Sequence, residues 1–204
     1  IGSGDFGTEA FRPEFAHLIF LNFQQQGLAG RDFLELGGGT GAFKENYLEH
    51  SPETNYLSAD ISKKFALMQA QVNGNAIVGD AAALPLHDNS IDGAIFSNEL
   101  IDVLPCRVFK LTKGNGRVRI NEEGYATTDG TALYFEFRNA ERDDFLETYE
   151  IFLNQGIHHI QDGDIISVAQ KSVDAIRESM RVLRSGKMMF VDYGFGRYPS
   201  CERK

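Results

Sequence analysis

Three alternating glycines stand in the segment FLELGGGTGAF, residues 33–43, which could hold a small ligand. Gly37, Gly39 and Gly41, with Gly38 among them, let the backbone turn sharply and approach a ligand without a side chain in between. The segment lies where a predicted strand meets a predicted helix, and the N-terminus of that helix offers unpaired N–H groups. A tight turn without a ligand is the alternative, but repeated glycines in this context favour a ligand-binding loop.

One carboxylate indicates which ligand this loop would take. Glu35 precedes the first glycine by two residues, and an acid at the mouth of a strand suits a ligand with an ammonium group. The same acid would repel the pyrophosphate of a dinucleotide, although Gly37, Gly39 and Ala42 also satisfy the dinucleotide fingerprint. S-adenosylmethionine (SAM), which carries an ammonium group, therefore fits better than NAD. An NAD-dependent oxidoreductase stays as the weaker alternative.

Two further acids follow the next predicted strands. Asp60 ends the second strand, where an acid can accept both ribose hydroxyls of a nucleoside, or else cap the following helix. Asp80 follows the third strand and could accept from an adenine amino group, or else serve as a turn aspartate. Ile61 and Leu84 could enclose the adenine ring, or else belong to the core. These residues support a nucleoside ligand and do not by themselves distinguish SAM from NAD.

Polar residues after the fourth predicted strand are the candidates for catalysis. In methyl transfer from a sulfonium the protein chiefly positions the acceptor and excludes water. Glu99 and Asp102 could hold a cationic acceptor such as a guanidinium, with Asn98 as an amide acceptor. Residues 98 and 102 would share a face on a helical turn, and the alternative for Asp102 is a solvent-facing carboxylate. Asp192 and Tyr193, after the fifth predicted strand, could reach the same place or serve as a turn cap and core residue.

Predicted helices alternate with predicted strands along most of the chain. Apolar residues at helical spacing predict a helix over 9–26, with Gly27 as its stop; the spaced residues are Phe11, Phe15, Leu18 and Leu21. This alternation predicts an α/β fold with a Rossmann-like, doubly wound and mostly parallel sheet. The predicted strands are at 32–37, 54–60, 75–80, 90–100 and 187–194, and the further helices are at 41–50, 62–72 and 164–184.

Residues 106–160 interrupt this alternation. The stretch 106–138 has the pattern of a β-hairpin, with a half-exposed strand over 117–120, and 141–156 predicts a helix. We therefore expect an insertion between the fourth strand and the long helix. Such an insertion could carry substrate specificity, and the alternative is a hairpin that only covers an edge of the sheet.

Composition narrows the class of protein. The chain has 204 residues, 42% of them hydrophobic, and a net charge of -9, which favours one globular domain and argues against non-specific nucleic-acid binding. The strongest early apolar run, FAHLIFLNF, is far shorter than the roughly 20 residues that span a bilayer. Cys106 and Cys201 form no CxxC pattern, and the start of the chain lacks the features of a signal peptide. We therefore expect a cytoplasmic protein with no metal site.

The order of these motifs resembles the class I SAM-dependent methyltransferases over residues 31–193. The matching pieces are LELGGGTG, LSADIS, VGDAAALPL, NSIDGAIFSNEL and RVLRSGKMMFVDYG. Three further pieces are similar to the MidA-like family: GDFGT at 4–8, SNELIDVLP at 97–105 and VDYGF at 191–195. That family includes the mitochondrial complex I assembly methyltransferase, which modifies an arginine of a complex I subunit.

The resemblance implies a role for each matching residue. Glu35 and the glycine loop would line the methionine end of SAM, and Asp60 would bind the ribose. Asp80 and Ala81 would lie at the adenine end. The methyl group would lie near Asn98 and Glu99, and an N-terminal cover over the pocket would include Asp5, Phe6 and Thr8. The whole chain, 1–204, would then form one methyltransferase domain, with residues 1–30 as a cover helix and 106–160 as the insertion.

The chain also departs from the pattern of these families. The superfamily sheet has seven strands, the last two in an antiparallel hairpin, whereas only five parallel strands are predicted here. We therefore expect a sheet that lacks the last two strands. The acceptor stays open between a protein arginine and a small molecule, because GDAAALPLHDNSIDG also resembles small-molecule methyltransferases. A SAM-binding assembly factor without turnover is the further alternative.

Overall fold

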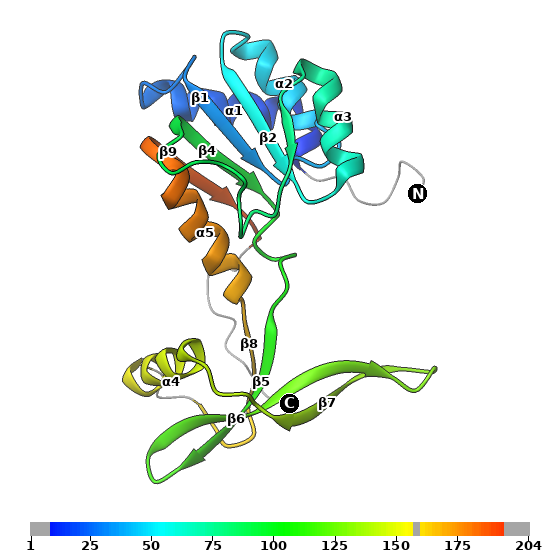
Figure 1. The fold of residues 1–204 in the computed structure, drawn as a ribbon, viewed down its shortest axis with the longest axis vertical. Helices are drawn as coiled ribbons and strands as arrows, with labels where there is room; N and C mark the ends of the chain where they lie inside the picture. Colours follow the sequence, from blue (N-terminus) through cyan, green and yellow to red (C-terminus); the bar gives the residue numbers. More distant parts are fainter. Residues whose placement is uncertain (1–8, 157–159, 194–204) are drawn as a thin grey trace. The chain divides into compact units, whose positions relative to one another are not determined.

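The computed structural model describes residues 9–156 and 160–193. The chain divides into two compact units, which are described separately (Figure 1). The first combines the residues up to Leu104 with those from Lys171 onward, and the second consists of Pro105–Gln170. The predicted insertion at 106–160 falls within the second unit, and the single domain over 1–204 stays a prediction.

A parallel five-stranded sheet forms the centre of the first unit. Its order is β3-β2-β1-β4-β9, and every neighbouring pair is parallel. This arrangement confirms the predicted doubly wound sheet and its five parallel strands. Within the described residues the sheet ends at β3 on one side and β9 on the other. The strands are β1 Asp32–Leu36, β2 Asn55–Asp60, β3 Ala76–Val78, β4 Ile91–Asn98 and β9 Leu183–Val191.

Side-chain alternation along β1 builds a separate core on each face of the sheet. Phe33 packs on one face, and its ring lies 4.8 Å from that of Tyr56 and 4.3 Å from that of Tyr47. Leu34 and Leu36 pack on the other face. The first face is covered by α1 Pro13–Gln25 and α2 Ala42–His50, and the second by α5 Gln170–Val182. A third helix, α3 Lys63–Asn73, packs against β2 and β3.

The N-terminal helix forms where it is predicted, and Phe15 and Leu21 of its predicted stripe are partly buried against the core. Residues Glu9–Phe11 form a 3₁₀ turn before α1, and Gly27 follows the helix with a positive φ of 72°. Of the predicted apolar stripe, Leu18 is 61% exposed and Phe11 49%. The buried residues are Ala16, Ile19, Phe20 and Phe23. The aromatic core of β1 and α2 thus covers the predicted stripe only in part, and residues beside that stripe form the fully buried face.

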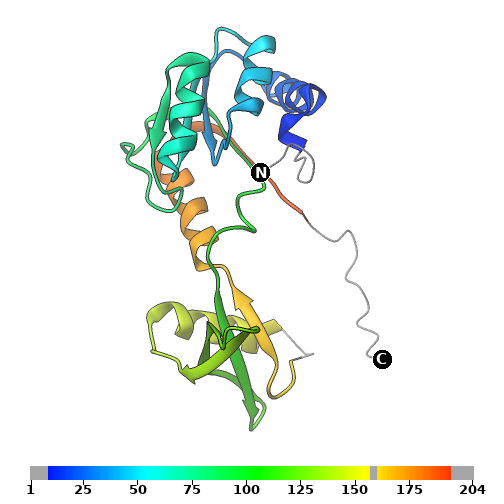
Figure 2. The same cartoon turned by 90° about the vertical axis from the view of Figure 1, so that its right-hand side faces the viewer.

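The second unit is an antiparallel sheet with one helix against it (Figure 2). Its order is β7-β6-β5-β8, and the predicted hairpin is confirmed as β5 and β6. The half-exposed strand over 117–120 is also confirmed, since Val118 and Ile120 are buried between exposed neighbours. The elements are β5 Arg107–Gly114, β6 Arg117–Thr128, β7 Leu133–Asn139, α4 Asp144–Gly156 and β8 Ile165–Val168.

The predicted long helix over 164–184 is wrong in its first part. Residues Ile165–Val168 form β8, which pairs with Arg107–Lys110 of β5, and α5 begins only at Gln170. A short apolar run fits a buried strand as well as a helix. The free edge of β5 decides between them, because its backbone groups gain partners from a strand.

Several sequence features lie outside the described residues. These are Asp5, Phe6 and Thr8 of the GDFGT motif, the end of VDYGF, and Cys201. Among the described helices, none has the length and apolar character needed to cross a membrane.

The face that α1 buries can be tested with two adjacent residues of the same size. Ile19 is 5% exposed and Leu18 is 61% exposed. We expect Ile19→Ala to lower the free energy of unfolding by about 2–5 kcal/mol, because it leaves a cavity in the aromatic core. The matched Leu18→Ala should cost less than about 0.5 kcal/mol. Urea denaturation followed by circular dichroism measures both, and equal losses would contradict the packing described for α1.

Candidate functional site

A small cleft lies between the carboxyl ends of β1 and β4. These strands are neighbours, and the chain reaches them by running outward through β2 and β3 and then returning to the other side of β1. Ligands of open α/β sheets bind at such a switch point. The cleft has a volume of about 170 Å³ and is lined by Ala10, Phe11, Glu35, Gly37, Gly38, Gly39, Thr40, Ala42, Phe43, Asn98 and Glu99.

The glycine loop has the backbone that its sequence predicts. Gly37, Gly39 and Gly41 have φ values of 71°, 53° and 88°, in the left-handed region that favours glycine. At Gly39 a Cβ atom would meet nothing within 4 Å among the described residues, so the loop is open there. At Gly38 a Cβ would lie 2.5 Å from Oε2 of Glu35. The need for glycine at position 38 therefore comes from the buried carboxylate.

Asp60 fastens the glycine loop to the end of β2. Its side chain accepts a hydrogen bond from the Gly39 amide at 3.1 Å and another from the Ser62 amide at 2.8 Å. Ser62 caps α3, accepting from Phe65, so helix capping is not the role of Asp60. From α3, Gln69 donates to the Gly39 carbonyl at 2.8 Å. Sequence reasoning missed Gln69, because nothing in the chain marks which helix residue faces the loop.

Glu35 is a buried acid, only 3% exposed. Burial raises its pKa from 4.5 to about 7, against the hydrogen bond from Tyr56 and the charge of Lys44, which lower it. The Tyr56 hydroxyl donates to the carboxylate at 3.0 Å. The charge of Asp60 also raises this pKa, by a smaller amount. The cleft therefore holds a carboxyl group that a nearby cation can readily ionise.

Lys44 is a buried cation whose charge acts on Glu35. Its side chain is fully buried, and burial lowers its pKa to about 8 although the charge of Glu35 raises it. The ammonium donates to the Ser58 hydroxyl at 3.2 Å and to the carbonyls of Gln69 and Asn75 at 3.1 and 2.7 Å. These bonds hold α2, α3 and β2 together behind the loop. Sequence reasoning missed Lys44, because a lysine in a predicted helix is expected to lie at the surface.

Asn98 and Glu99 form the other wall of the cleft. Asn98 is the last residue of β4, and Glu99 has a positive φ of 51°, which is unusual for a residue with a side chain. The Glu99 amide donates to the Val191 carbonyl at 2.8 Å, which links this turn to β9. A hydrogen bond to the Glu99 carboxylate raises the pKa of Tyr193. The structure thus brings Tyr193, a weaker candidate in the sequence, to the same turn.

Asp102 lies apart from these residues. The segment after β4 forms a bend and a short turn, so the expected helical turn that would place positions 98 and 102 on one face is wrong. The Asp102 amide instead donates a hydrogen bond to the Asp192 carboxylate at 3.1 Å. Asp102 is exposed and does not line the cleft. Its role toward an acceptor stays a prediction.

The predicted adenine end also lies outside the cleft. Asp80 accepts from the Ala82 amide at 2.8 Å and pairs with Lys171 at 3.5 Å, as a turn aspartate would. Ala81 packs against the core on the α5 face, and Leu84 is buried there. Ile61 is 73% exposed beside Asp60. The adenine-binding roles of these residues stay predictions, except that Leu84 is a core residue.

A family model described as "Putative S-adenosyl-L-methionine-dependent methyltransferase" matches residues 15–204. The chain belongs to this family. The match confirms the predicted methyltransferase class and SAM as its cofactor. Among the described residues, no group of three His, Cys, Asp or Glu side chains could hold a metal ion.

Individual relatives share less of the chain. The malonyl-[acyl-carrier protein] O-methyltransferase of Methylococcus capsulatus is 29% identical over 132 residues, which are 59% of this chain and 48% of that protein. The chain thus spans about half the length of this curated relative. A putative SAM-dependent methyltransferase from Methanococcus maripaludis is 14% identical, with 93% of this chain and 67% of that chain covered and a TM-score of 0.44. A SAM-dependent methyltransferase from Aquifex aeolicus is 17% identical, with 44% and 58% covered and a TM-score of 0.33.

The raised pKa of Glu35 predicts how stability depends on pH. Between about pH 4.5 and 7 the folded chain holds a proton at Glu35 that the unfolded chain has lost. Binding of this proton stabilises the folded chain relative to the unfolded one. The stabilisation is fully present below about pH 4.5 and is lost as the pH rises through about 7. Relative to Glu35→Gln, the wild type should lose about 3 kcal/mol over this range, at about 1.4 kcal/mol per pKa unit.

Urea denaturation at pH 5, 6, 7 and 8 measures this difference. Glu49→Gln, at an exposed position of α2, is the matched control and should stay parallel to the wild type. If the wild type and Glu35→Gln have parallel pH profiles, Glu35 is ionised in the folded chain throughout and the raised pKa is wrong.

Proposed function

We propose that this chain binds SAM across the carboxyl ends of β1, β2 and β4 and transfers its methyl group to an acceptor beside Asn98 and Glu99. The observation that carries the proposal is the cleft at the switch point. There a buried acid and an open glycine loop face two polar residues that follow β4. This is the place where an α/β sheet binds a nucleotide-like ligand.

The residues of the cleft suit the parts of SAM. Glu35 can take the ammonium group, because a buried carboxyl with a pKa of about 7 ionises when a cation approaches. Gly39 leaves room above the loop. Asp60 accepts from the Ser62 amide at Oδ1 and from the Gly39 amide and the Gln69 side chain at Oδ2, which leaves a lone pair of Oδ1 for a ribose hydroxyl. Glu35 lies in β1, Gly39 in the loop that follows, and Asp60 at the end of β2. This order matches the order of the ammonium group and the ribose in SAM.

The adenosine part would lie on the more open surface next to the cleft. The cleft volume of about 170 Å³ is below the roughly 300–1,000 Å³ of ordinary ligand pockets, so it suits the methionine end. Ile61 is largely exposed beside Asp60, and an adenine ring would cover it. Asp80 and Ala81 follow β3 at the same edge of the sheet and are the proposed partners of the adenine edge.

Methyl transfer requires the chain chiefly to position the acceptor. SAM supplies a methyl group that is already activated by its sulfonium, so the protein must align the acceptor and exclude water. The Glu99 carboxylate and the Asn98 amide stand at the end of β4 to hold the acceptor, with Tyr193 bonded to Glu99. Residues 1–30 are proposed as a cover, since Ala10 and Phe11 already line the cleft. In this proposal 1–204 is one methyltransferase domain with 106–160 as its insertion.

For the acceptor, we propose a protein arginine, in keeping with the MidA-like segment SNELIDVLP. An arginine stays protonated, so carboxylates are needed to hold its guanidinium. Glu99 lines the cleft, and the exposed Asp102, outside the cleft, is the second proposed carboxylate. A small-molecule acceptor is the second candidate. The likeness to the Methylococcus O-methyltransferase, whose name gives a malonyl group on an acyl-carrier protein, supports an acceptor other than arginine.

Calorimetric titration with SAM, S-adenosylhomocysteine (SAH) and NADH tests the cofactor site. We expect micromolar dissociation constants for SAM and SAH. Asp60→Ala should weaken both at least about tenfold, because the ribose loses a charged hydrogen-bond acceptor. Gly39→Ala should do the same by placing a methyl group in the open space over the loop.

Asp144→Ala, at the exposed start of α4, is the matched control for lost charge and should leave the affinity unchanged. Thermal melts show that each variant is folded. Tighter binding of NADH than of SAM would overturn the cofactor proposal, and no binding of SAM to the folded chain would overturn the proposed function as a whole.

Release of SAH in the presence of candidate acceptors tests the transfer step. We expect arginine-containing peptides to be methylated, and Glu99→Gln to lower kcat/KM about tenfold or more while the dissociation constant of SAM changes less than about twofold. Methylation of small metabolites but no peptide would support the second candidate. SAM binding without SAH release from any acceptor would favour an assembly factor without turnover.

A further inference from the structure

Two arginines of β6 differ from the other arginines that the structure describes. Arg117 and Arg119 form no ion pair, whereas the other eight each pair with an Asp or Glu. The chain has an excess of acids, with a net charge of -9. Two unpaired guanidinium groups on one strand are therefore the exception in this protein. The charge of Arg119 acts on Glu150, but no carboxylate of the described residues lies within ion-pair distance of either arginine.

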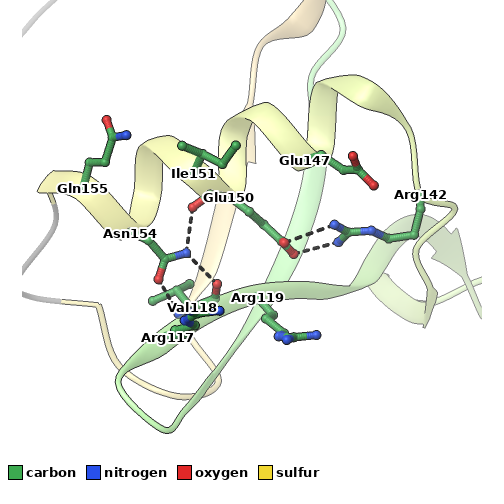
Figure 3. Close-up of a pocket in the computed structure, with 9 residues that line it drawn as sticks. All are labelled: Arg117, Val118, Arg119, Arg142, Glu147, Glu150, Ile151, Asn154 and Gln155. Carbon is green, nitrogen blue, oxygen red and sulfur yellow. Dashed lines mark hydrogen bonds and ion pairs between the residues drawn. The ribbon is translucent and has the colours of Figure 1, made fainter.

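The backbone beneath this pair is held firmly. Over residues 117–120 the outer edge of β6 has no strand partner, because β7 pairs only from Glu122 onward. Helix α4 takes that place (Figure 3). Asn154 accepts from the Val118 amide and donates to the Val118 carbonyl, both at 2.9 Å. Glu150 accepts from the Ile120 amide at 2.6 Å. The arginines thus stand on a fixed strand.

Two cavities share these arginines. The larger, of about 550 Å³, lies between β6 and α4 and is lined by Arg117, Val118, Arg119, Arg142, Glu147, Glu150, Ile151, Asn154 and Gln155. The smaller, of about 430 Å³, is lined by Thr112, Gly114, Asn115, Arg117 and Arg119. Both fall in the size range of small-molecule sites, roughly 300–1,000 Å³.

The charges around the pair leave it available to an anion. In the larger cavity, Arg142 donates to both oxygens of Glu150, at 2.7 and 3.1 Å, so this carboxylate is already occupied. Glu147 is the remaining acid there. The smaller cavity has no acid in its lining. Thr112 accepts from Asn121 at 3.2 Å, which leaves its hydroxyl proton free to donate.

We propose that Arg117 and Arg119, with Thr112 and Asn115, form a binding site for the phosphate group of a small organic phosphate. The two arginines alternate with buried residues, so they share a face with their Cα atoms roughly 7 Å apart. Each guanidinium offers a planar pair of donors. A phosphate has enough oxygens to accept from both forks, whereas one carboxylate is filled by a single fork. This inference does not rest on the proposed methyl transfer.

Titration of the full chain with inorganic phosphate and pyrophosphate, at constant ionic strength, tests the site. Binding is followed by amide chemical shifts and by calorimetry. We expect shifts centred on residues 112–119, and a dissociation constant that rises about tenfold or more in the variant Arg117→Gln with Arg119→Gln. The paired variant Arg138→Gln with Arg177→Gln removes the same charge from two exposed, ion-paired arginines and should change it less than about twofold.

Three results would overturn the proposal. The first is no binding of phosphate or pyrophosphate beyond that of chloride at the same ionic strength. The second is an equal loss in both double variants, which would show a general effect of charge. The third is binding of a single-stranded oligonucleotide as tight as that of pyrophosphate, which would contradict a small ligand.

Arg117 and Arg119 are exposed and unpaired, so thermal melts of their double variant should match the wild type.

Discussion

The position of β1 between β2 and β4 is the constraint on which the first unit depends. Its side chains alternate, so Phe33 and Glu35 belong to one face and Leu34 and Leu36 to the other. The aromatic core under α1 and α2 and the aliphatic core under α5 are therefore built from one strand. The same placement puts the residues that follow β1 beside those that follow β4. Packing and the candidate site thus have a common origin.

Burial of Glu35 links this packing to electrostatics. The carboxyl is enclosed because it follows Phe33 on the core face, and the absence of side chains at Gly38 gives it space. Tyr56 bonds to it, and Lys44 contributes a nearby positive charge from behind the loop. Burying a carboxylate is costly unless it is paired, which is why its pKa rises to about 7. The raised pKa is thus a consequence of the packing of β1 and of the glycine loop around this carboxyl.

In the second unit, the main structural requirement is to supply partners for the backbone groups at strand edges. Edge strands expose backbone groups that invite pairing with other chains. Here β8 covers one edge of β5, and the side chains of α4 satisfy the first half of β6. Arg117 and Arg119, at the start of β6, are exposed and form no ion pair among the described residues.

The sequence alone determined the parallel sheet, the sharply turning glycine loop and the SAM-dependent methyltransferase class, because local backbone requirements and strand-helix alternation depend on neighbouring residues. It also placed Glu35, Asn98 and Glu99 at one edge, since the carboxyl ends of parallel strands meet there. Only the tertiary structure decided which residues of α1 are fully buried, that residues 165–168 form a strand, and that Lys44 and Gln69 support the loop. Those outcomes depend on which distant elements pack together, and residues at a given spacing fit more than one partner until the fold brings that partner to them.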